Sequence, residues 1–593
     1  MSWIAIVIFV VKALWVLAFG MGLATVLTWV DRRGGAMFQD RVGPHRAVFF
    51  LPRNVAQALV ALPGLLIAGG VGFYVTTREA HGADRMGHAA FCMHLAIFAV
   101  WATGMLVARQ IRYRGIKNSF DNFIDSLGDP RRIFYVGVAV HAVVLLGGLM
   151  FRRTPVGSWL AEIGYASGPA VFAGVVLGAS AYGWYVIKDE KRVGIRLAGL
   201  LHPMADGLKT IVKEDLVPPK SDRLLHGLAP IISFFPVLVL MAIVPFGDTL
   251  CFGTNQEGVI ELGKLLPSVP REGVCVEGAV PLQVVDLNVG MLYFFAIAGT
   301  GVVGAALAGW SSDNKFSLLG GLRAASQMVS YEVTLGLTLV GALMIYGTLQ
   351  MDQMVQWQAE NAWGIFVQPF AFVLFLAAAI AESKRVPFDL PEGESELVAG
   401  YFTEYSGMKF TMFFFSEYIA VVVSSAVMAT IFFGGWHVPF LERDGLMLAI
   451  GDTVLFSAQL SHGAVILLGV ISFIIKVLAL CWVQAAIRWT LPRFRYDQLM
   501  RLGWRMLLPA SLVNVLATGL VILGLQSGGP QTQQVLGAVG DLSMAVVVIA
   551  DVVLTVLFVR FLLAPPQKRK LVASSAARLI AQVGGLKSTR MGA

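Results

Sequence analysis

The chain has 593 residues, of which 57% are hydrophobic and 14% are charged, with a formal net charge of +8 and a mean hydropathy of +0.72. Soluble domains carry about 25% charged residues, so the composition excludes an ordinary soluble protein and indicates a polytopic membrane protein. The apolar runs are continuous rather than alternating, which argues against a transmembrane β-barrel. The positive charge is gathered in one set of loops between these runs, so it does not indicate a nucleic-acid partner.

The apolar runs predict an all-α, polytopic membrane helix bundle with about 13 transmembrane helices, at roughly 20 residues per crossing. The first run is too long for the apolar core of a signal peptide and has no small-residue cleavage site, so we interpret it as a retained span. The predicted spans are 4–30, 55–76, 88–108, 133–151, 168–187, 228–246, 288–309, 328–347, 364–381, 410–433, 464–486, 508–525 and 542–563.

The loops between the spans alternate in charge. Lys and Arg gather in one set, which includes 31–33, 109–117, 188–192, 488–495 and 567–570. Loops rich in these residues face the cytoplasm, so we expect the N-terminus outside and the C-terminus, with the loop 382–409, in the cytoplasm. The segment 197–216 is amphipathic and too polar to span, which predicts a surface helix at the cytoplasmic interface.

The four cysteines include no C-x-x-C pair, which argues against an iron–sulfur or four-thiolate zinc site. Cys251 and Cys275 share the predicted outside loop 247–287, where an oxidising compartment allows a disulfide. Two free thiols fit that loop equally well. Cys92 and Cys481 lie in predicted spans, where we interpret them as packing residues.

Two other patterns have competing interpretations. GTGVVG at 299–304 matches a dinucleotide-binding motif, but it lies within a span with no preceding strand, which favours close helix packing instead. His88, His94 and His141 lie in or beside predicted spans, where two facing histidines could ligate a haem. Packed or interfacial histidines explain them better.

The stretch 381–418 carries an excess of carboxylates between two spans. They are Glu382, Asp389, Glu392, Glu394, Glu396, Glu404 and Glu417, against the cations Lys384, Arg385 and Lys409. Ionisable groups at or near membrane depth usually mark an ion or proton path. Glu332 and Glu382 would place two carboxylates on neighbouring spans, as proton carriers. The alternative pairs Glu332 with Arg323, and Glu382 with Lys384 or Arg385.

Glu392, Glu394 and Glu396 alternate with small residues, so they do not share one helix face. The aromatic residues around them, from Phe388 to Tyr405, indicate a packed loop rather than a solvated one. Phe413, with Phe414 and Phe415, begins the next span and could line a slot for a flat apolar head group. Ordinary interfacial aromatic residues are the alternative.

Several long stretches of the chain match one known family. They include DRRGGAMFQDRVGPHR (31–46), GLLHPMADGLKTIVKEDLVP (199–218), AGWSSDNKFSLLGGLRAASQMVSYEVTLG (308–336), AESKRVPFDLPEGESELVAGYFTEYSGMKF (381–410) and LPRFRYDQLMRLGW (491–504). In these stretches the chain resembles the H-type membrane component of the respiratory NADH:quinone oxidoreductase, complex I, which is called subunit 1 in mitochondria. The resemblance covers the first span and nearly everything from about 192 to 525.

The resemblance implies a subunit that joins the membrane arm to the redox arm, in a bacterial inner membrane. It would form much of the quinone tunnel and the start of the carboxylate path that couples quinone reduction to proton pumping. NADH, FMN and iron–sulfur clusters would belong to partner subunits, with quinone as substrate and no cofactor or metal bound by this chain. The implied proton-path residues are Glu332, Glu382, Asp389, Glu392, Glu394, Glu396, Glu404 and Glu417, and the quinone-site residues are Asp31, Arg32, Asp206, Lys209, Glu214, Arg385, Phe388 and Phe413.

The chain departs from the family pattern at several points. Asp31 replaces a usual Glu, His45 a usual Asn and His202 a usual Gln. An insert with four spans and an extra last span are added. We therefore divide the chain into 1–46 (first span), 47–190 (inserted module), 191–526 (quinone-site and coupling core) and 527–593 (extra span and basic tail).

Two other functions compete with this interpretation. A homologous subunit of a membrane-bound hydrogenase, or of a ferredoxin- or deazaflavin-driven complex, is the nearer one. The complete VPFDLPEGESELVAGYFTEYSGMKF stretch favours the quinone branch. A stand-alone ion transporter would have inverted repeats and broken helices at the membrane midplane, and the family-matching part contains no such repeat.

Overall fold

The computed structural model describes residues 3–40, 43–44, 49–52, 54–58, 61–62, 65, 176–177, 180, 192–195, 199–254, 260–265, 278–393, 398–443, 445–450, 453–526 and 542–563. The chain divides into two compact units. One consists of Met1–Gly43 with Pro203–Ala593, and the other is Pro44–His202. The four spans predicted between 55 and 187 fall almost entirely outside the described residues, so they stay predictions.

In the smaller unit, two short strands pair antiparallel. They are β1 (Phe49–Pro52) and β2 (Arg192–Ile195), with Phe49 opposite Ile195 and Pro52 opposite Arg192. The pairing brings together two segments that are far apart in sequence and that lie near the start and just beyond the end of the predicted insert.

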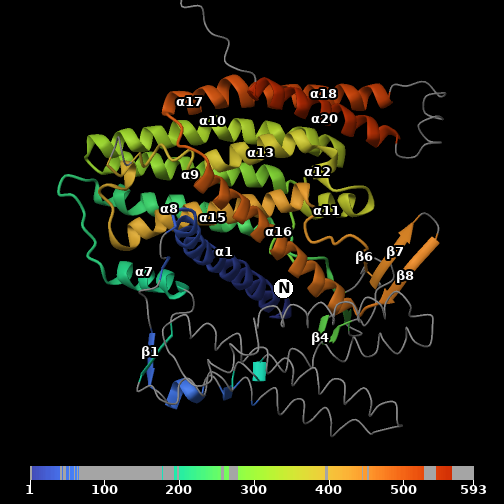
Figure 1. The fold of residues 1–593 in the computed structure, drawn as a ribbon, viewed down its shortest axis with the longest axis horizontal. Helices are drawn as coiled ribbons and strands as arrows, with labels where there is room; N and C mark the ends of the chain where they lie inside the picture. Colours follow the sequence, from blue (N-terminus) through green and yellow to red (C-terminus); the bar gives the residue numbers. More distant parts are fainter. Residues whose placement is uncertain are drawn as a thin grey trace, which may run out of the picture. The chain divides into compact units, whose positions relative to one another are not determined.

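The larger unit is a bundle of long apolar helices (Figure 1). Seven helices of the described chain are long and apolar enough to cross a membrane, which confirms the predicted helical membrane bundle. They are α1 (Trp3–Phe38), α8 (Arg223–Leu240, extended by η2, Met241–Ile243), α9 (Gly290–Ser311), α10 (Lys315–Tyr346), α15 (Gly407–Phe432), α16 (His462–Thr490), and the continuous run of α17 (Tyr496–Leu502), η4 (Gly503–Leu507) and α18 (Leu508–Gln526).

Shorter elements complete this unit. The helices are α7 (Leu201–Val212), α11 (Met351–Glu360), α12 (Gly364–Val367), α13 (Pro369–Glu382), the 3₁₀ turn η3 (Gly400–Phe402) and α20 (Leu542–Leu563). Helix α7 is the predicted surface helix. Met204, Leu208 and Ile211 on its apolar face are each more than 60% exposed. That exposure is typical of a helix that lies at a membrane or partner surface.

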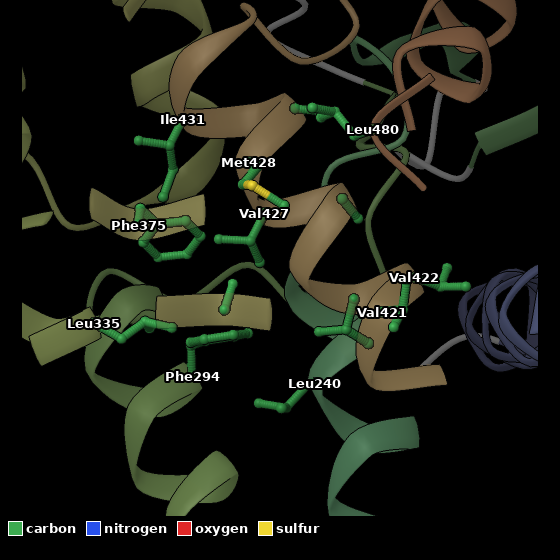
Figure 2. Packing of buried hydrophobic residues seen from close by; sticks show 14 of the residues in the cluster. Leu240, Phe294, Leu335, Phe375, Val421, Val422, Val427, Met428, Ile431 and Leu480 are labelled. Atoms are coloured by element: carbon green, nitrogen blue, oxygen red, sulfur yellow. The ribbon is translucent and has the colours of Figure 1, made fainter. Parts of the chain in front are cut away.

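Helix α15 is the most buried of the seven long helices and lies at the centre of the core. Figure 2 shows Val427 and Met428 of α15 close to Phe375 of α13, with Leu335 of α10 and Phe294 of α9 nearby. Apolar contact adds little driving force between helices in lipid, so close van der Waals packing has to hold them together.

Small residues bring two of these helices into direct contact. A Cβ atom at Gly304 of α9 would lie 2.2 Å from Ser233 Oγ and 3.0 Å from the Ala229 carbonyl oxygen of α8. Only glycine fits there, so the GTGVVG segment serves close helix packing in the structure.

The predicted outside loop 247–287 contains a small sheet that hydropathy does not reveal. Its strands are β3 (Leu250–Thr254), β4 (Ile260–Leu265) and β5 (Ala279–Val280), in the order β4-β3-β5, and a second sheet has the order β6-β7-β8 (Leu441–Glu442, Gly445–Ile450, Thr453–Gln459). Arg443 pairs with Asp248, so the segment that carries the first sheet contacts the segment that carries the second.

Cys251 is disulfide-bonded, but Cys275 lies outside the described residues, so their pairing stays a prediction. Cys481 is a buried free thiol.

Candidate functional site

The predicted carboxylate stretch begins where α13 ends. Lys384 has φ +55°, in the left-handed region, and is only 8% exposed. This backbone conformation costs a side-chain-bearing residue about 1–2 kcal/mol, so its surroundings must hold it. Gln327 of α10 supplies part of that support, because its Nε2 donates hydrogen bonds to the carbonyl oxygens of Ala381 (2.7 Å) and Phe388 (2.9 Å). The turn therefore directs Lys384 into the bundle.

Glu417 of α15 is the centre of the resulting ion network and is 3% exposed. Its Oε1 lies 4.0 Å from Lys384 Nζ, and its Oε2 lies 3.5 Å from Arg385 Nη2. The Tyr401 hydroxyl donates a hydrogen bond to Oε1 (3.2 Å) and accepts one from Lys384 Nζ (3.0 Å). A buried carboxylate is thus compensated by two cations and a phenol.

Arg385 extends this network toward α1 and α16. Its guanidinium lies 3.8 Å from the centroid of the Tyr418 ring. The Tyr418 hydroxyl donates to Asp31 Oδ2 (2.7 Å), and Asp31 also pairs with Arg488 of α16. These four side chains line a cavity whose empty volume, including its open mouth, is about 380 Å³.

Glu382 faces a second cavity, among α8, α9, α10, α13 and α15. Glu382, Lys384 and Glu417 supply its ionisable lining, and its empty volume is about 650 Å³ with the open mouth included. Neither Glu332 nor Glu382 forms an ion pair within the part of the chain that the structure describes. The alternative pairing of Glu382 with Lys384 or Arg385 is wrong for these residues, because both cations face Glu417.

Glu332 lies against the helix opposite. A Cβ atom at Gly299 of α9 would come within 2.7 Å of Glu332 Oε1. The Glu332 carboxylate therefore occupies space that a side chain on α9 would otherwise fill. Arg323, the cation considered as its partner, places its guanidinium 5.6 Å from the centroid of the Tyr496 ring.

Two further carboxylates lie in the loop after α13, outside the spanning helices. Asp389 forms an ion pair with Arg493, and burial raises the pKa of Asp389 to about 6. Burial, together with the charges of Glu417 and Asp389, raises the pKa of Glu392 to about 9. Burial and the neighbouring charges thus favour the protonated form of Glu392, whereas the pairing with Arg493 favours the ionised form of Asp389. Glu394 and Glu396 lie outside the described residues.

Glu404 contacts a different neighbour. Its Oε1 accepts a hydrogen bond from Asn314 Nδ2 (2.6 Å), at the start of α10. The next residue, Tyr405, stacks on His226 of α8 with ring centroids 4.0 Å apart. Glu404 thus ties the loop to α10, apart from the ion network around Glu417.

The structure brings together some of the predicted quinone-site residues. Arg32 Nη2 lies 2.6 Å from Asp206 Oδ2, and both side chains are about half exposed, at 46% and 45%. Asp31 and Arg385 meet through Tyr418, as described above. Lys209 and Glu214 are exposed on and just after α7.

The two predicted aromatic residues of that site are packing residues in the structure. Phe388 is 6% exposed and stacks on Phe494 with ring centroids 5.3 Å apart. Phe413 is 1% exposed and lies within an aromatic cluster that includes Tyr401, Phe402 and Tyr405. Phe413 therefore fills the interior of the protein.

Sequence reasoning did not identify several residues that complete the network, namely Gln327, Tyr401, Tyr418, Arg488 and Arg493. The sequence pattern marks Tyr401 only as an aromatic flank of the loop. The sequence signal for such residues was a polar or cationic side chain within or beside an apolar span, as at Gln327 and Arg488. Within the described ranges, no group of three or more His, Cys, Asp or Glu side chains is arranged to hold a metal ion.

Comparisons with known proteins agree on one family. A family model described as NADH dehydrogenase matches residues 189–519. An H-type chain of the NADH-quinone oxidoreductase of Geobacter sulfurreducens is 44% identical over 324 residues, which cover 55% of this chain and 82% of that protein. The H-type chain of Thermomicrobium roseum is 40% identical over 371 residues (60% and 94%), and that of Flavobacterium psychrophilum is 39% identical over 362 (60% and 95%). The protein is thus longer than these relatives, and it belongs to the NADH dehydrogenase family, as an H-type subunit of NADH-quinone oxidoreductase.

Proposed function

We propose that this chain is the membrane subunit of a proton-translocating NADH:quinone oxidoreductase that forms much of the quinone tunnel and the first part of its proton path. The observation that carries the proposal is the buried network around Glu417, which is continuous from Asp31 on α1 to the cavity that Glu382 faces. Relatives named as H-type components of NADH-quinone oxidoreductase support it. The names favour the quinone branch over a hydrogenase.

The network suggests how quinone chemistry affects charge inside the membrane. Reduction of a quinone to its quinol takes up equal numbers of electrons and protons. The protein groups that supply these protons become more negative, so the charge near Asp31, Arg385 and Tyr418 changes. Arg385 and Lys384 share Glu417 as counter-ion, so a change in the charge near Arg385 alters the balance on Lys384. Lys384 lines the same cavity as Glu417 and Glu382. Movement of the Lys384 ammonium group toward Glu382 favours release of a proton from the Glu382 carboxyl group.

The two carboxylates without a cation are the proton carriers in this proposal. Glu382 is influenced by the charges of Glu332 and Lys384, so ionisation of one carboxylate opposes ionisation of the other. Such coupled groups exchange protons singly rather than together. Asp389, Glu392, Glu394, Glu396 and Glu404 form the loop that connects this pair to the quinone side.

The proposal also places the chain in its cellular context. It lies in a bacterial inner membrane, with the N-terminus outside and the C-terminus and the loop 382–409 in the cytoplasm. Its partners are the other membrane-arm subunits and the redox-arm subunits nearest the quinone. NADH, FMN and iron–sulfur clusters are held by those partners, and quinone is the substrate. Asp31, Arg32, Asp206, Lys209, Glu214 and Arg385 define the quinone side in this proposal.

Glu382→Gln and Glu332→Gln, each made in the whole complex, test the proton path. Both substitutions keep the side-chain shape and remove the titratable proton. We expect NADH:quinone turnover and proton pumping to fall together, with NADH oxidation by an artificial acceptor in the redox arm unchanged. Wild-type NADH:quinone turnover in both variants would refute the path.

A further inference from the structure

Helix α20 follows the family-matching residues and carries one buried acid. Asp551 is 3% exposed, as is expected of the bundle-facing side, whereas Ile549, Val553 and Leu557 are each more than half exposed. Phe558 on the same side packs edge-on against Phe370 of α13, with ring centroids 5.3 Å apart. The family model ends at 519, so this acid is an addition to the family core. A buried carboxylate in a membrane helix is costly and needs a compensating interaction.

That interaction is with the first turn of α13. The opening backbone N–H groups of a helix lack partners within the helix, and in lipid they must be satisfied within the protein. Gln368, the residue before the first turn, makes no side-chain cap, and Pro369 has no N–H to donate. The Phe370 N–H donates instead to Asp551 Oδ2 at 2.7 Å. A carboxylate is also the group that the positive end of a helix dipole favours.

A buried polar network surrounds this contact and explains why Gln368 does not cap its own helix. Its Nε2 donates to Thr518 Oγ1 (2.9 Å), and its Oε1 accepts from Asn514 Nδ2 (3.4 Å). Both partners belong to α18 and are at least nine-tenths buried. Gly341 of α10 leaves room for the two amides, because a Cβ atom there would lie 2.9 Å from each of them. Gln368, Asn514 and Thr518 thus form a buried polar group between α13 and α18. Helix α20 packs against both of these helices (Figure 1).

We infer that Asp551 is a positioning residue for the coupling carboxylates, through which the added helix α20 anchors α13 by capping it from outside. Helix α13 has 14 residues and ends at Glu382, so the cap and the proton-path carboxylate lie at opposite ends of one short rigid rod. Loss of the cap allows α13 to tilt or to shift along its axis, which moves Glu382 relative to Glu332. This inference rests on the proposed role of Glu382.

The test compares Asp551→Leu with Asp551→Asn in the assembled complex. Leucine fills the site and removes the acceptor, whereas asparagine keeps an oxygen that can accept from the Phe370 N–H. We expect D551L to lower NADH:quinone turnover several-fold and to shift its pH profile. D551N should have the NADH:quinone turnover and pH profile of the wild type. NADH oxidation by an artificial acceptor should not change in either variant. Val553→Ala, on the exposed side of the same helix, is the matched control and should behave as wild type.

Each outcome decides the matter. Wild-type turnover and pH profile in D551L would overturn the inference, and so would D551N as impaired as D551L, because charge rather than capping would then be needed. Should D551L not assemble, Phe558→Ala loosens the same docking without touching a polar group, and a wild-type rate and profile there would overturn it. If Glu382→Gln has no effect, the proposed path fails. If E382Q impairs turnover and D551L does not, only the anchor fails.

Discussion

The carboxylates of the site fall into two groups that differ in their partners. Glu417, Asp31 and Asp389 each face an Arg, whereas Glu332 and Glu382 form no ion pair with any described residue. The two groups lie on different elements: Asp31, Glu417 and Asp389 belong to α1, α15 and the loop after α13, whereas Glu332 and Glu382 belong to α10 and the end of α13. In the proposed function, this difference means that the paired carboxylates hold the loop and helices in place, while the unpaired ones bind and release protons.

The largest effect should come from the centre of the paired group. In Glu417→Ala, Lys384 and Arg385 stay buried without their counter-ion. Removing one partner of a buried ion pair costs about 3–5 kcal/mol, so we expect the subunit to fail to assemble. The amount of assembled complex on native gels, and the melting temperature of whatever assembles, would measure this.

Two controls separate the loss of charge balance from the loss of a side chain. Glu417→Ala combined with Lys384→Met removes one of the stranded cations, so it should assemble better than Glu417→Ala alone. Glu382→Gln should assemble as wild type, because it leaves no described cation without a partner. An E417A complex with wild-type abundance and melting temperature would show that the paired group is not structural.

The next effect is a pH dependence of the loop, from Glu392. Its pKa is raised from the usual 4.5 to about 9 by burial and by the charges of Glu417 and Asp389. A carboxyl whose pKa is raised by folding contributes its full stabilisation of the folded loop below the usual 4.5, and this contribution is lost progressively as the pH rises from there to about 9. We expect protease cleavage within the loop 383–406 to increase in wild type as the pH rises toward 9, and to level off above it.

Glu392→Gln is the matched variant, because it keeps the neutral shape at every pH. Its loop should stay protected as the pH rises to 9, and its NADH:quinone turnover should lack the alkaline decline that we expect of wild type. Equal alkaline cleavage in wild type and E392Q would remove Glu392 as the cause. Glu404→Gln, with a carboxylate that contacts Asn314 instead, should leave the alkaline opening unchanged.

The smallest effect on stability should come from the pair between Arg32 and Asp206. Both side chains are about half exposed, and such surface pairs are worth about 0–1 kcal/mol. Asp206→Ala should therefore leave the melting temperature nearly unchanged. It should instead raise the KM for quinone or alter inhibitor sensitivity, and normal values of both would take Asp206 out of the quinone side.

Hydropathy predicted the bounds of a helix closely where contact with lipid determines the amino-acid composition of that helix. Helices α9, α16 and α18 begin and end within a few residues of the predicted spans. Helix α10 begins at Lys315, well before the predicted 328, because its first turns pack against other protein segments. Small residues such as Gly320 and Gly321 serve that packing, and their low hydropathy conceals the helix.

The carboxylates of the site were predictable as a group, but their partners were not. Lys384 and Arg385 follow Glu382 closely in sequence, yet the left-handed turn at Lys384 directs both toward Glu417. Arg488 and Arg493 reach the site from a segment about 100 residues further along the chain or more, as the pair between Arg493 and Asp389 illustrates. Such pairs depend on how the helices cross, which single-sequence patterns do not encode.

Gly299 has a consequence for how this site can be manipulated. The oxygen that a methyl group at 299 would meet belongs to the flexible end of the Glu332 side chain, not to backbone. Gly299→Ala would therefore displace the Glu332 carboxyl group without removing any ionisable group of the protein. One added methyl group on α9 would thus change the distance from the Glu332 carboxyl group to its neighbours. The set of ionisable groups would stay the same.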